Sequence, residues 1–346
     1  MKHVDIEQRQ KKVLSAIVES YIDGAAPVGS RAVSQRFRWS MSPATIRNVM
    51  ADLEEAGLIT HPHTSAGRVP TDKGYRFYVN SLLEPKHLTK EEESIIVRML
   101  NRKSEDFESL MQNASRAISM ITNEAGIVLT PRLKKSIFKR IEFIPVDSSR
   151  ALTILITRSG IVKNAVLDME EGLTKSELFR ISEFLNQELE GMFLGEIRNH
   201  LTRRLLEERD SFYTFLKKAV SMLSNPNFFK MEERLYFEGT SGLMSHPEFE
   251  DIKKARVFLK LFEDKTDLVD LFNEDMESDG IKVHIGKENN CKHIQDCTIV
   301  TCNYQINGRT IGALGAIGPT RMEYGKVISA VDYLSKVLGR VLEDLG

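Results

Sequence analysis

The chain has 346 residues, which predicts two or three domains, and its 48 Lys and Arg residues nearly balance 49 Asp and Glu residues, for a net charge of −1. That balance excludes a protein that coats nucleic acid over its whole surface, but it permits positive charge on one small module. No stretch approaches about 18 apolar residues and the N-terminus has no apolar signal segment, so we expect no contact with a membrane. Three cysteines are too few for a disulfide framework, which predicts a soluble protein of the reducing cytoplasm.

The first 84 residues predict three helices followed by a hairpin and a fourth helix. Apolar residues recur at spacings of three and four in the first helix. Ser30 and Ser42-Pro43 are suitable starts for the next two helices, and Gly57 ends the third. The predicted helices cover residues 5–23, 30–37, 42–56 and a segment from Thr71, and the predicted strands cover 58–60 and 68–69. This order is that of a winged helix-turn-helix.

Glu84-Pro85 is the first plausible domain boundary. Thr89 and Glu92 form a capping box for a linking helix, and another helix is predicted from about Glu105 to Glu124. From Lys139 short Ile-, Val- and Thr-rich runs alternate with turns, which predicts an antiparallel meander, followed by helices over about 174–223. After a short extended segment beyond Leu235, the predicted helices cover 248–262, 265–274 and a C-terminal stretch, and the strands cover 281–285, 298–305 and 310–316. We therefore predict an α+β multidomain protein.

Two windows near the N-terminus contain no acidic residue. Residues 24–51 carry Arg31, Arg36, Arg38 and Arg47, and residues 56–71 add Arg68, His61 and His63. Local positive charge of this kind is expected where phosphates bind, although charge alone does not distinguish such a surface from an ordinary solvated face.

The helix that begins at Ser42 has two different faces. At about 100° per residue its apolar residues form one stripe, whereas Ala44, Asn48 and Ala51 lie opposite, with Arg47 and Thr45 beside them. Small side chains allow a helix to enter a major groove, where Asn pairs with adenine and Arg with guanine or phosphate. Without this fold around it, Asn48 would be interpreted as an ordinary surface residue.

The loop of the hairpin contains small and polar residues but no large apolar one. It suits a wing that contacts the DNA backbone or minor groove, and the alternative is a plain exposed hairpin. The predicted DNA-binding residues are Arg31, Ser42, Ala44, Thr45, Arg47, Asn48, His63, Thr64, Ser65 and Arg68.

Long segments of the chain resemble the HrcA family of bacterial heat-inducible transcription repressors. The strongest block is SPATIRNVMADLEEAGLITHPHTSAGRVPTDKGYRFYV at Ser42–Val79, and IGPTRMEYGKVISAVDYLS at 317–335 is also long and specific. Shorter blocks are IEFIPV at 141–146, FLNQEL at 184–189 and HPEF at 246–249.

The resemblance implies a three-part organisation and a set of partners. It implies a winged-helix domain, a GAF-like domain and a dimerising domain inserted within the GAF-like one. From the sequence pattern we place the winged helix at 1–84, a linker helix and the first part of the GAF-like domain at 85–137, and the rest of the GAF-like domain at 229–346. We place the insert at 138–228, because that meander with its helices looks self-contained. The resemblance further implies a homodimer that binds the inverted-repeat CIRCE operator of chaperonin and DnaK-type chaperone operons, and a chaperonin that keeps the repressor active. A homodimer agrees with the physics, because two recognition helices related by a two-fold axis read an inverted repeat.

Other chemistries are less well supported by the sequence. Cys291, His293, Cys297 and Cys302 lack the Cys-x₂-Cys spacing of zinc sites, and the last two would face opposite sides of a strand, so we expect no metal or other cofactor. The glycines of 312–318 lack the spacing of a nucleotide loop and no acid–base pair is evident, so we predict no catalytic residues and no enzyme. A GAF-like domain can also sense a small molecule, so a ligand-controlled regulator of another regulon remains the alternative.

Overall fold

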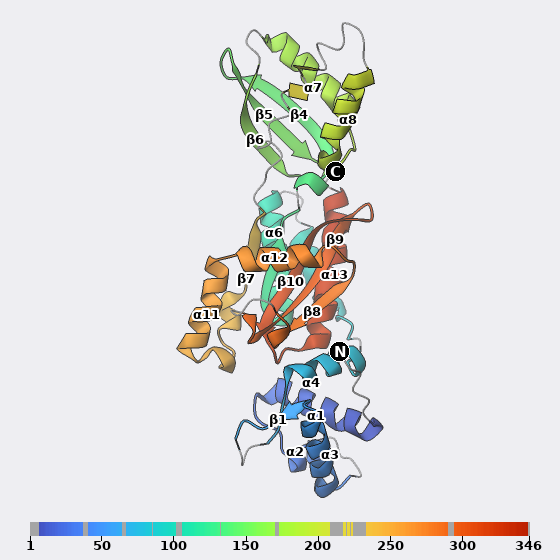
Figure 1. Cartoon of the computed structure of the whole chain (residues 1–346), viewed down its shortest axis with the longest axis vertical. Coiled ribbons are helices and arrows are strands. Elements are labelled where there is room, and N and C mark those ends of the chain that lie inside the picture. Colours follow the sequence, from blue (N-terminus) through green and yellow to red (C-terminus); the bar gives the residue numbers. More distant parts are fainter. Residues whose placement is uncertain are drawn as a thin grey trace.

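The computed structural model shows three units arranged along one long axis (Figure 1). We call them the N-terminal unit (residues 7–84), the central unit (86–131 and 233–344) and the outer unit (133–223). The described residues are 7–36, 41–63, 67–84, 86–101, 106–131, 133–169, 173–207, 217–218, 220–221, 223, 233–289 and 294–344. None of the helices in these ranges is long and apolar enough to cross a membrane.

The N-terminal unit is a winged helix, as predicted. Its elements are α1 (Gln8–Gly24), α2 (Ser30–Arg36), α3 (Pro43–Glu55), β1 (Ile59–Thr60), β2 (Val69–Pro70) and α4 (Asp72–Ser81). The apolar stripes of the helices meet in one core, in which Leu14, Ile17, Ile46 and Leu53 are fully buried. Strands β1 and β2 pair in antiparallel fashion, with Thr60 opposite Val69.

The central unit is built on a five-stranded antiparallel sheet in the order β7-β3-β10-β9-β8. The strands are β3 (Ala125–Leu129), β7 (Leu235–Glu238), β8 (Ile281–Ile285), β9 (Cys297–Ile306) and β10 (Arg309–Pro319). The helices are α5 (Lys90–Leu100), α6 (Phe107–Thr122), α10 (Thr240–Leu243), η2 (Pro247–Phe249), α11 (Ile252–Glu263), α12 (Thr266–Asp275), η3 (Gly286–Glu288) and α13 (Tyr324–Asp344).

Each face of this sheet has its own core. One face packs on α6 and α13 and includes Cys302, and the other packs on α10 to α12 and includes Cys297. The prediction that these two cysteines face opposite sides of a strand is therefore confirmed. Both cysteines are buried.

The outer unit contains the predicted meander. Its elements are η1 (Leu133–Lys135), β4 (Phe138–Pro145), β5 (Arg150–Thr157), β6 (Val162–Asp168), α7 (Lys175–Leu189) and α8 (Leu194–Glu207). One face of the sheet packs on the helices and forms a core that is separate from the other two. The chain enters this unit after β3 and returns in β7, and these two strands pair directly, with Leu129 opposite Leu235.

Strand β3 was not predicted from the sequence. Helix α6 ends at Thr122 because Asn123 adopts a left-handed conformation with φ of 59°, and the five residues of β3 follow immediately. All five are buried. A short apolar run of this kind has no alternation that would distinguish a buried strand from the end of a buried helix.

Candidate nucleic-acid interface

The N-terminus of α3 is formed by the predicted cap. The Ser42 hydroxyl accepts a hydrogen bond from the backbone N–H of Thr45 at 3.1 Å, and Pro43 occupies the first helical position. This arrangement satisfies one of the free N–H groups and costs no hydrogen bond at the proline. The start of α3, where a recognition helix contacts bases, is thereby fixed.

The two faces of α3 are those predicted from its sequence. Ile46 and Leu53 are fully buried and Val49 and Met50 nearly so. The opposite face is exposed and contains Ala44, Arg47, Asn48, Ala51, Asp52 and Glu55. In Figure 1 this helix lies at the end of the N-terminal unit that faces away from the central unit.

Two exposed cations beside this face are available for an external partner. Neither Arg47 of α3 nor Arg31 of α2 has a hydrogen bond or ion pair with any described residue, and the same holds for Asn48. Arg36 differs, because its guanidinium forms an ion pair with Asp23 at the end of α1. The basic window of the sequence is thus partly neutralised by an acid that lies just outside it.

The base of the wing is tied to the turn before α2. Val28 and Arg68 exchange two backbone hydrogen bonds, of 2.8 and 2.9 Å, and so extend the β1–β2 hairpin by one bridge. Gly67 lets the chains approach this closely, because a Cβ atom there would lie 2.7 Å from the backbone of Pro27. His63 is exposed in the loop between β1 and β2. Thr64 and Ser65, like Arg38, Cys291 and His293, lie outside the described residues.

Glu54 joins the wing to α3, a role that the sequence analysis missed. Its carboxylate forms an ion pair with Arg68 at 2.8 Å and a contact with the His61 ring. Burial would raise the pKa of Glu54, but the His61 hydrogen bond and the Arg68 charge outweigh it, and the pKa is lowered. Arg68 therefore has an internal partner, unlike Arg31 and Arg47. The sequence does not single out Glu54, because Glu55 lies nearer to the hairpin.

Six of the predicted site residues lie on or directly before two consecutive helices of the N-terminal unit. Ser42, Ala44, Thr45, Arg47 and Asn48 belong to the first half of α3 or its cap, and Arg31 lies on the preceding helix. The roles of these residues in DNA binding remain predictions. Among the described residues, no group of three or more His, Cys, Asp or Glu side chains could hold a metal ion.

Two family models match the chain. One, described as "Winged helix-turn-helix transcription repressor, HrcA DNA-binding", matches residues 5–82, and the other, "HrcA protein C terminal domain", matches residues 108–328. The chain belongs to the HrcA family. It is a heat-inducible transcription repressor with an N-terminal DNA-binding winged helix.

Curated relatives and a solved structure match this chain over nearly its whole length. Heat-inducible transcription repressor HrcA of Geobacter sulfurreducens is 40% identical over 98% of this chain and 99% of its own. The HrcA of Pelotomaculum thermopropionicum is 39% identical over 98% of this chain and 97% of its own. A crystal structure described as a hypothetical protein covers 99% of this chain and 100% of its own with a TM-score of 0.64, and its 24% identity supports the fold alone.

Proposed function

We propose that this HrcA-family chain binds the inverted-repeat CIRCE operator as a homodimer in the cytoplasm, represses chaperone operons, and catalyses no reaction. The observation that carries the proposal is the exposed face of α3, where Arg47 and Asn48 have no described partner beside small side chains. Such a face fits a major groove. Arg31 on the preceding helix α2 would then contact the phosphate backbone beside that groove.

A homodimer is supported by the exposed face of the outer sheet. Along β5 the buried residues alternate with Leu152, Ile154 and Ile156, and Leu152 lies between Ile144 and Val166 of the neighbouring strands. Ile144 is 45% and Val166 is 53% exposed. An apolar face of this kind is typical of a surface that associates with another chain. We propose that residues 138–228 form the dimerising domain. It is inserted in a GAF-like domain whose first part lies with a linker helix in 85–137 and whose remainder is 229–346.

Chaperonin control is the part of the proposal that rests on the family resemblance. A repressor of marginal stability would lose its active form when heat or unfolded proteins occupy the chaperonin, and transcription would then rise. The alternative is a small molecule that acts on the GAF-like domain and controls another regulon.

Operator binding tests the proposal directly. Purified full-length protein is titrated against labelled DNA from upstream of the organism's chaperone genes, and against a scrambled duplex, at several salt concentrations. We expect selective retention that weakens steeply as salt rises, because phosphate contacts release counterions. Equal binding to both duplexes would refute the proposal. Adding chaperonin should increase the active fraction, whereas a response to a small metabolite alone would favour the ligand sensor.

A further inference from the structure

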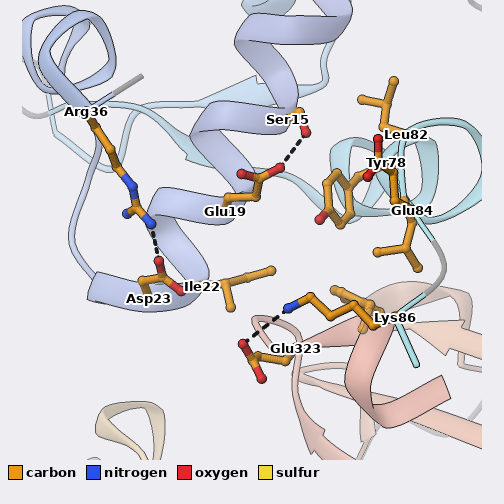
Figure 2. Close-up of a pocket in the computed structure, with 13 residues that line it drawn as sticks. Ser15, Glu19, Ile22, Asp23, Arg36, Tyr78, Leu82, Glu84, Lys86 and Glu323 are labelled. Carbon is orange, nitrogen blue, oxygen red and sulfur yellow. Dashed lines mark hydrogen bonds and ion pairs between the residues drawn. The ribbon is translucent and has the colours of Figure 1, made fainter. Parts of the chain in front are cut away.

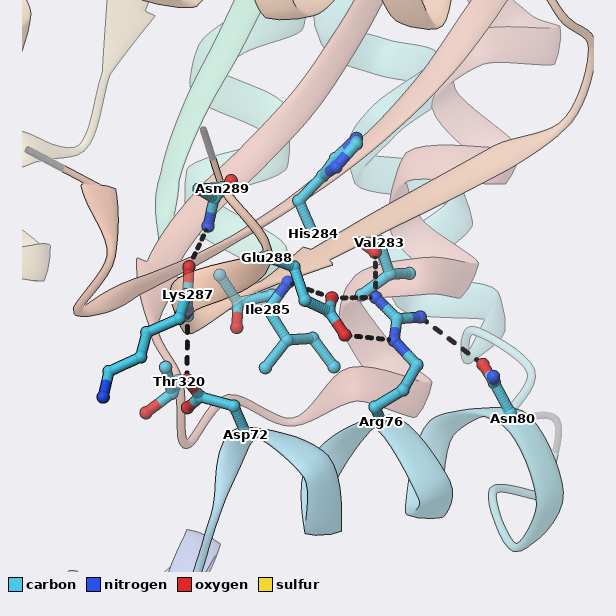
Figure 3. Close-up of polar contacts among 12 residues, drawn as sticks. Asp72, Arg76, Asn80, Val283, His284, Ile285, Lys287, Glu288, Asn289 and Thr320 are labelled. Atoms are coloured by element: carbon cyan, nitrogen blue, oxygen red, sulfur yellow. Dashed lines mark hydrogen bonds and ion pairs between the residues drawn. The ribbon is translucent and has the colours of Figure 1, made fainter. Parts of the chain in front are cut away.

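Helix α4 of the N-terminal unit is held against the central unit by a compact set of polar contacts. Arg76 donates to both carboxylate oxygens of Glu288, with Nε 2.8 Å from Oε1, and also to the backbone carbonyl of Val283 (Figure 3). One turn earlier, the carboxylate of Asp72 accepts a hydrogen bond of 3.0 Å from the backbone N–H of Lys287. We call Asp72, Arg76, Gly286 and Glu288 the latch.

The contacts of the latch depend on both the distance and the orientation of α4 relative to η3. A guanidinium that binds a carboxylate through two parallel hydrogen bonds fixes orientation as well as distance. Arg76 and Glu288 are only 19% and 31% exposed, so solvent screens their pairing incompletely. Gly286 has a φ of 53°, and a Cβ atom there would lie 2.4 Å from the Asp72 carboxylate. The approach of α4 to η3 therefore requires glycine at this position.

The two units also make an apolar contact, since buried residues of both, Tyr75 and Tyr324 among them, belong to one hydrophobic cluster. Arg321 of the central unit donates to the backbone carbonyl of Ile22 at 2.9 Å, and the rings of Tyr75 and Tyr324 lie 5.7 Å apart. Next to them, a cavity of about 470 Å³ separates α1 and α4 from the start of α13 (Figure 2). Lys86 and Glu323, which both belong to the central unit, pair along one side of the cavity at 3.6 Å. The latch adds to this apolar contact a directional polar one, between α4 and η3.

The latch lies on the opposite side of the N-terminal unit from the recognition helix. Figure 1 shows α4 next to the central unit and α3 at the far end of the molecule. The latch therefore does not cover the DNA-binding face, and its effect is on where that face points. In a dimer, the distance between two recognition helices depends on the angle at which each N-terminal unit is mounted.

We propose that the latch is a positioning device that sets the half-site spacing which the dimer reads. This inference rests on the proposed binding of an inverted repeat. An operator longer or shorter by one base pair displaces one half-site along the helix axis and rotates it around that axis. A latched dimer cannot follow this change without breaking contacts at Arg76 or Asp72, whereas an unlatched one can.

The test uses full-length protein and a set of operators whose spacers are one or two base pairs shorter or longer than the preferred one. For the wild type we expect operator affinity to fall at least about ten-fold for each base pair added to or removed from the spacer. A fall of this size corresponds to the loss of a single good base contact. Arg76→Glu and Glu288→Arg should each flatten this profile to within about three-fold, and the double variant should restore its slope, because the pair is reformed with its charges exchanged. Arg116→Glu is the matched control, since it breaks an exposed pair with Glu238 inside the central unit.

A glycine pair separates the latch from a general effect of charge. Gly286→Ala should flatten the spacing profile, because the new methyl group displaces Asp72. Gly308→Ala introduces a similar backbone strain at φ of 72°, but nothing lies within 4 Å of its Cβ position, so it should keep the wild-type profile. The proposal would be overturned if Arg76→Glu, Glu288→Arg and Gly286→Ala kept the wild-type profile, or bound every spacing more tightly by the same factor.

A measurement without DNA distinguishes failure of the latch from failure of the proposed function. Spin labels introduced at Ala51 and Arg340, in dimers diluted with unlabelled protein, report the distance between the N-terminal and central units. We expect a narrow distance distribution in the wild type, a broad one in Arg76→Glu, and recovery in the double variant. An equally narrow distribution in Arg76→Glu refutes the latch even if operator binding holds. Absence of operator binding in the wild type refutes the proposed function and the spacing role with it.

Discussion

At the scale of single residues, the exposed face of α3 makes the sharpest prediction. Asn48→Ala and Arg47→Ala should each weaken operator binding by about 1–3 kcal/mol, because each removes a base or phosphate contact. Both side chains are exposed and lack described partners, so the fold should be unchanged. Binding is measured by fluorescence anisotropy, folding by circular dichroism, and Arg340→Ala on α13 serves as the control. Wild-type affinity in both variants would show that α3 does not read the operator.

The slope of affinity against salt distinguishes the two kinds of contact. If Arg47 binds a phosphate, Arg47→Ala should weaken binding to all sequences alike and lower the salt slope by about one unit. If it binds a guanine, the loss should be confined to operators that carry that base, with the slope nearly unchanged.

Glu54 makes a prediction about pH at the base of the wing. Because the pKa of Glu54 is lowered in the folded protein, the stabilisation by its carboxylate is present above the usual pKa of glutamate. It is lost as the pH falls through the lower, folded value. Glu54→Gln should remove that stabilisation, about 1 kcal/mol or less for a partly exposed pair.

Hydrogen exchange at the Val28 and Arg68 amides, which bond to each other across the wing base, measures this effect locally. Protection in the wild type should exceed that in Glu54→Gln at pH 7, and the difference should shrink below about pH 4, where glutamate becomes protonated. Glu55→Gln, at an exposed neighbouring position without a described partner, is the matched control. A difference that does not change with pH would contradict the role of the carboxylate.

At the scale of helices and strands, an element could be predicted from the sequence when the residues that define it lie close together in the chain. Helix α3 begins at a serine cap and ends before Gly57, whose φ of 72° suits glycine, so both ends were evident from the sequence. Strand β3 could not be predicted, because its five buried residues lack alternation and its partners β7 and β10 lie more than a hundred residues away. The meander of β4 to β6 was predictable because short turns join neighbouring strands.

The outer face of that meander predicts where two copies meet. Leu152→Lys places a charge in the centre of the row formed with Ile144 and Val166, and a buried, unpaired charge is strongly unfavourable. We expect the dimer dissociation constant to rise about a hundred-fold or more, equivalent to roughly 3 kcal/mol. Sedimentation equilibrium measures it. Met120→Lys, at an exposed apolar residue of α6, is the control, and an undisturbed Leu152→Lys dimer would place the interface elsewhere.

At the scale of the whole molecule, the positive charge is concentrated in two short segments of the N-terminal unit. The acid-free windows 24–51 and 56–71 carry a charge of +5 within a chain of −1, so the remaining residues sum to −6. The structure shows that Arg36 and Arg68 pair with Asp23 and Glu54, acids that lie just outside those windows. A sequence window cannot reveal neighbours of this kind, because pairing is decided in space. Arg31 and Arg47, which have no partner among the described residues, then leave only a small local charge, which favours specific contacts over indiscriminate attraction to DNA.

The three-unit organisation predicts that the outer unit can be removed without unfolding the rest. The chain leaves and re-enters the central sheet at adjacent points, since the N–H of Thr130 donates to the carbonyl of Arg234 at 2.9 Å. A short glycine-serine turn in place of residues 131–233 can therefore close the gap between β3 and β7. The core of the outer unit forms a separate cluster, so the deletion removes that core as a whole. It also removes the surface pair of Glu196 with Arg309 and the packing of Ile137 and Phe193 on the central core.

The deleted protein should be a folded monomer that reads a single half-site. Its affinity for the inverted repeat should fall by about 10²–10⁴, because the second half-site is no longer bound intramolecularly. Sedimentation and operator titration measure the two effects, and circular dichroism verifies that the remaining units are folded. A deletion variant that is still dimeric would show that the central or N-terminal units supply the interface, and the Leu152→Lys dimer should then be unaffected as well. A monomer that binds single half-sites as tightly as wild type binds them would confirm that dimerisation and reading belong to opposite ends of the molecule.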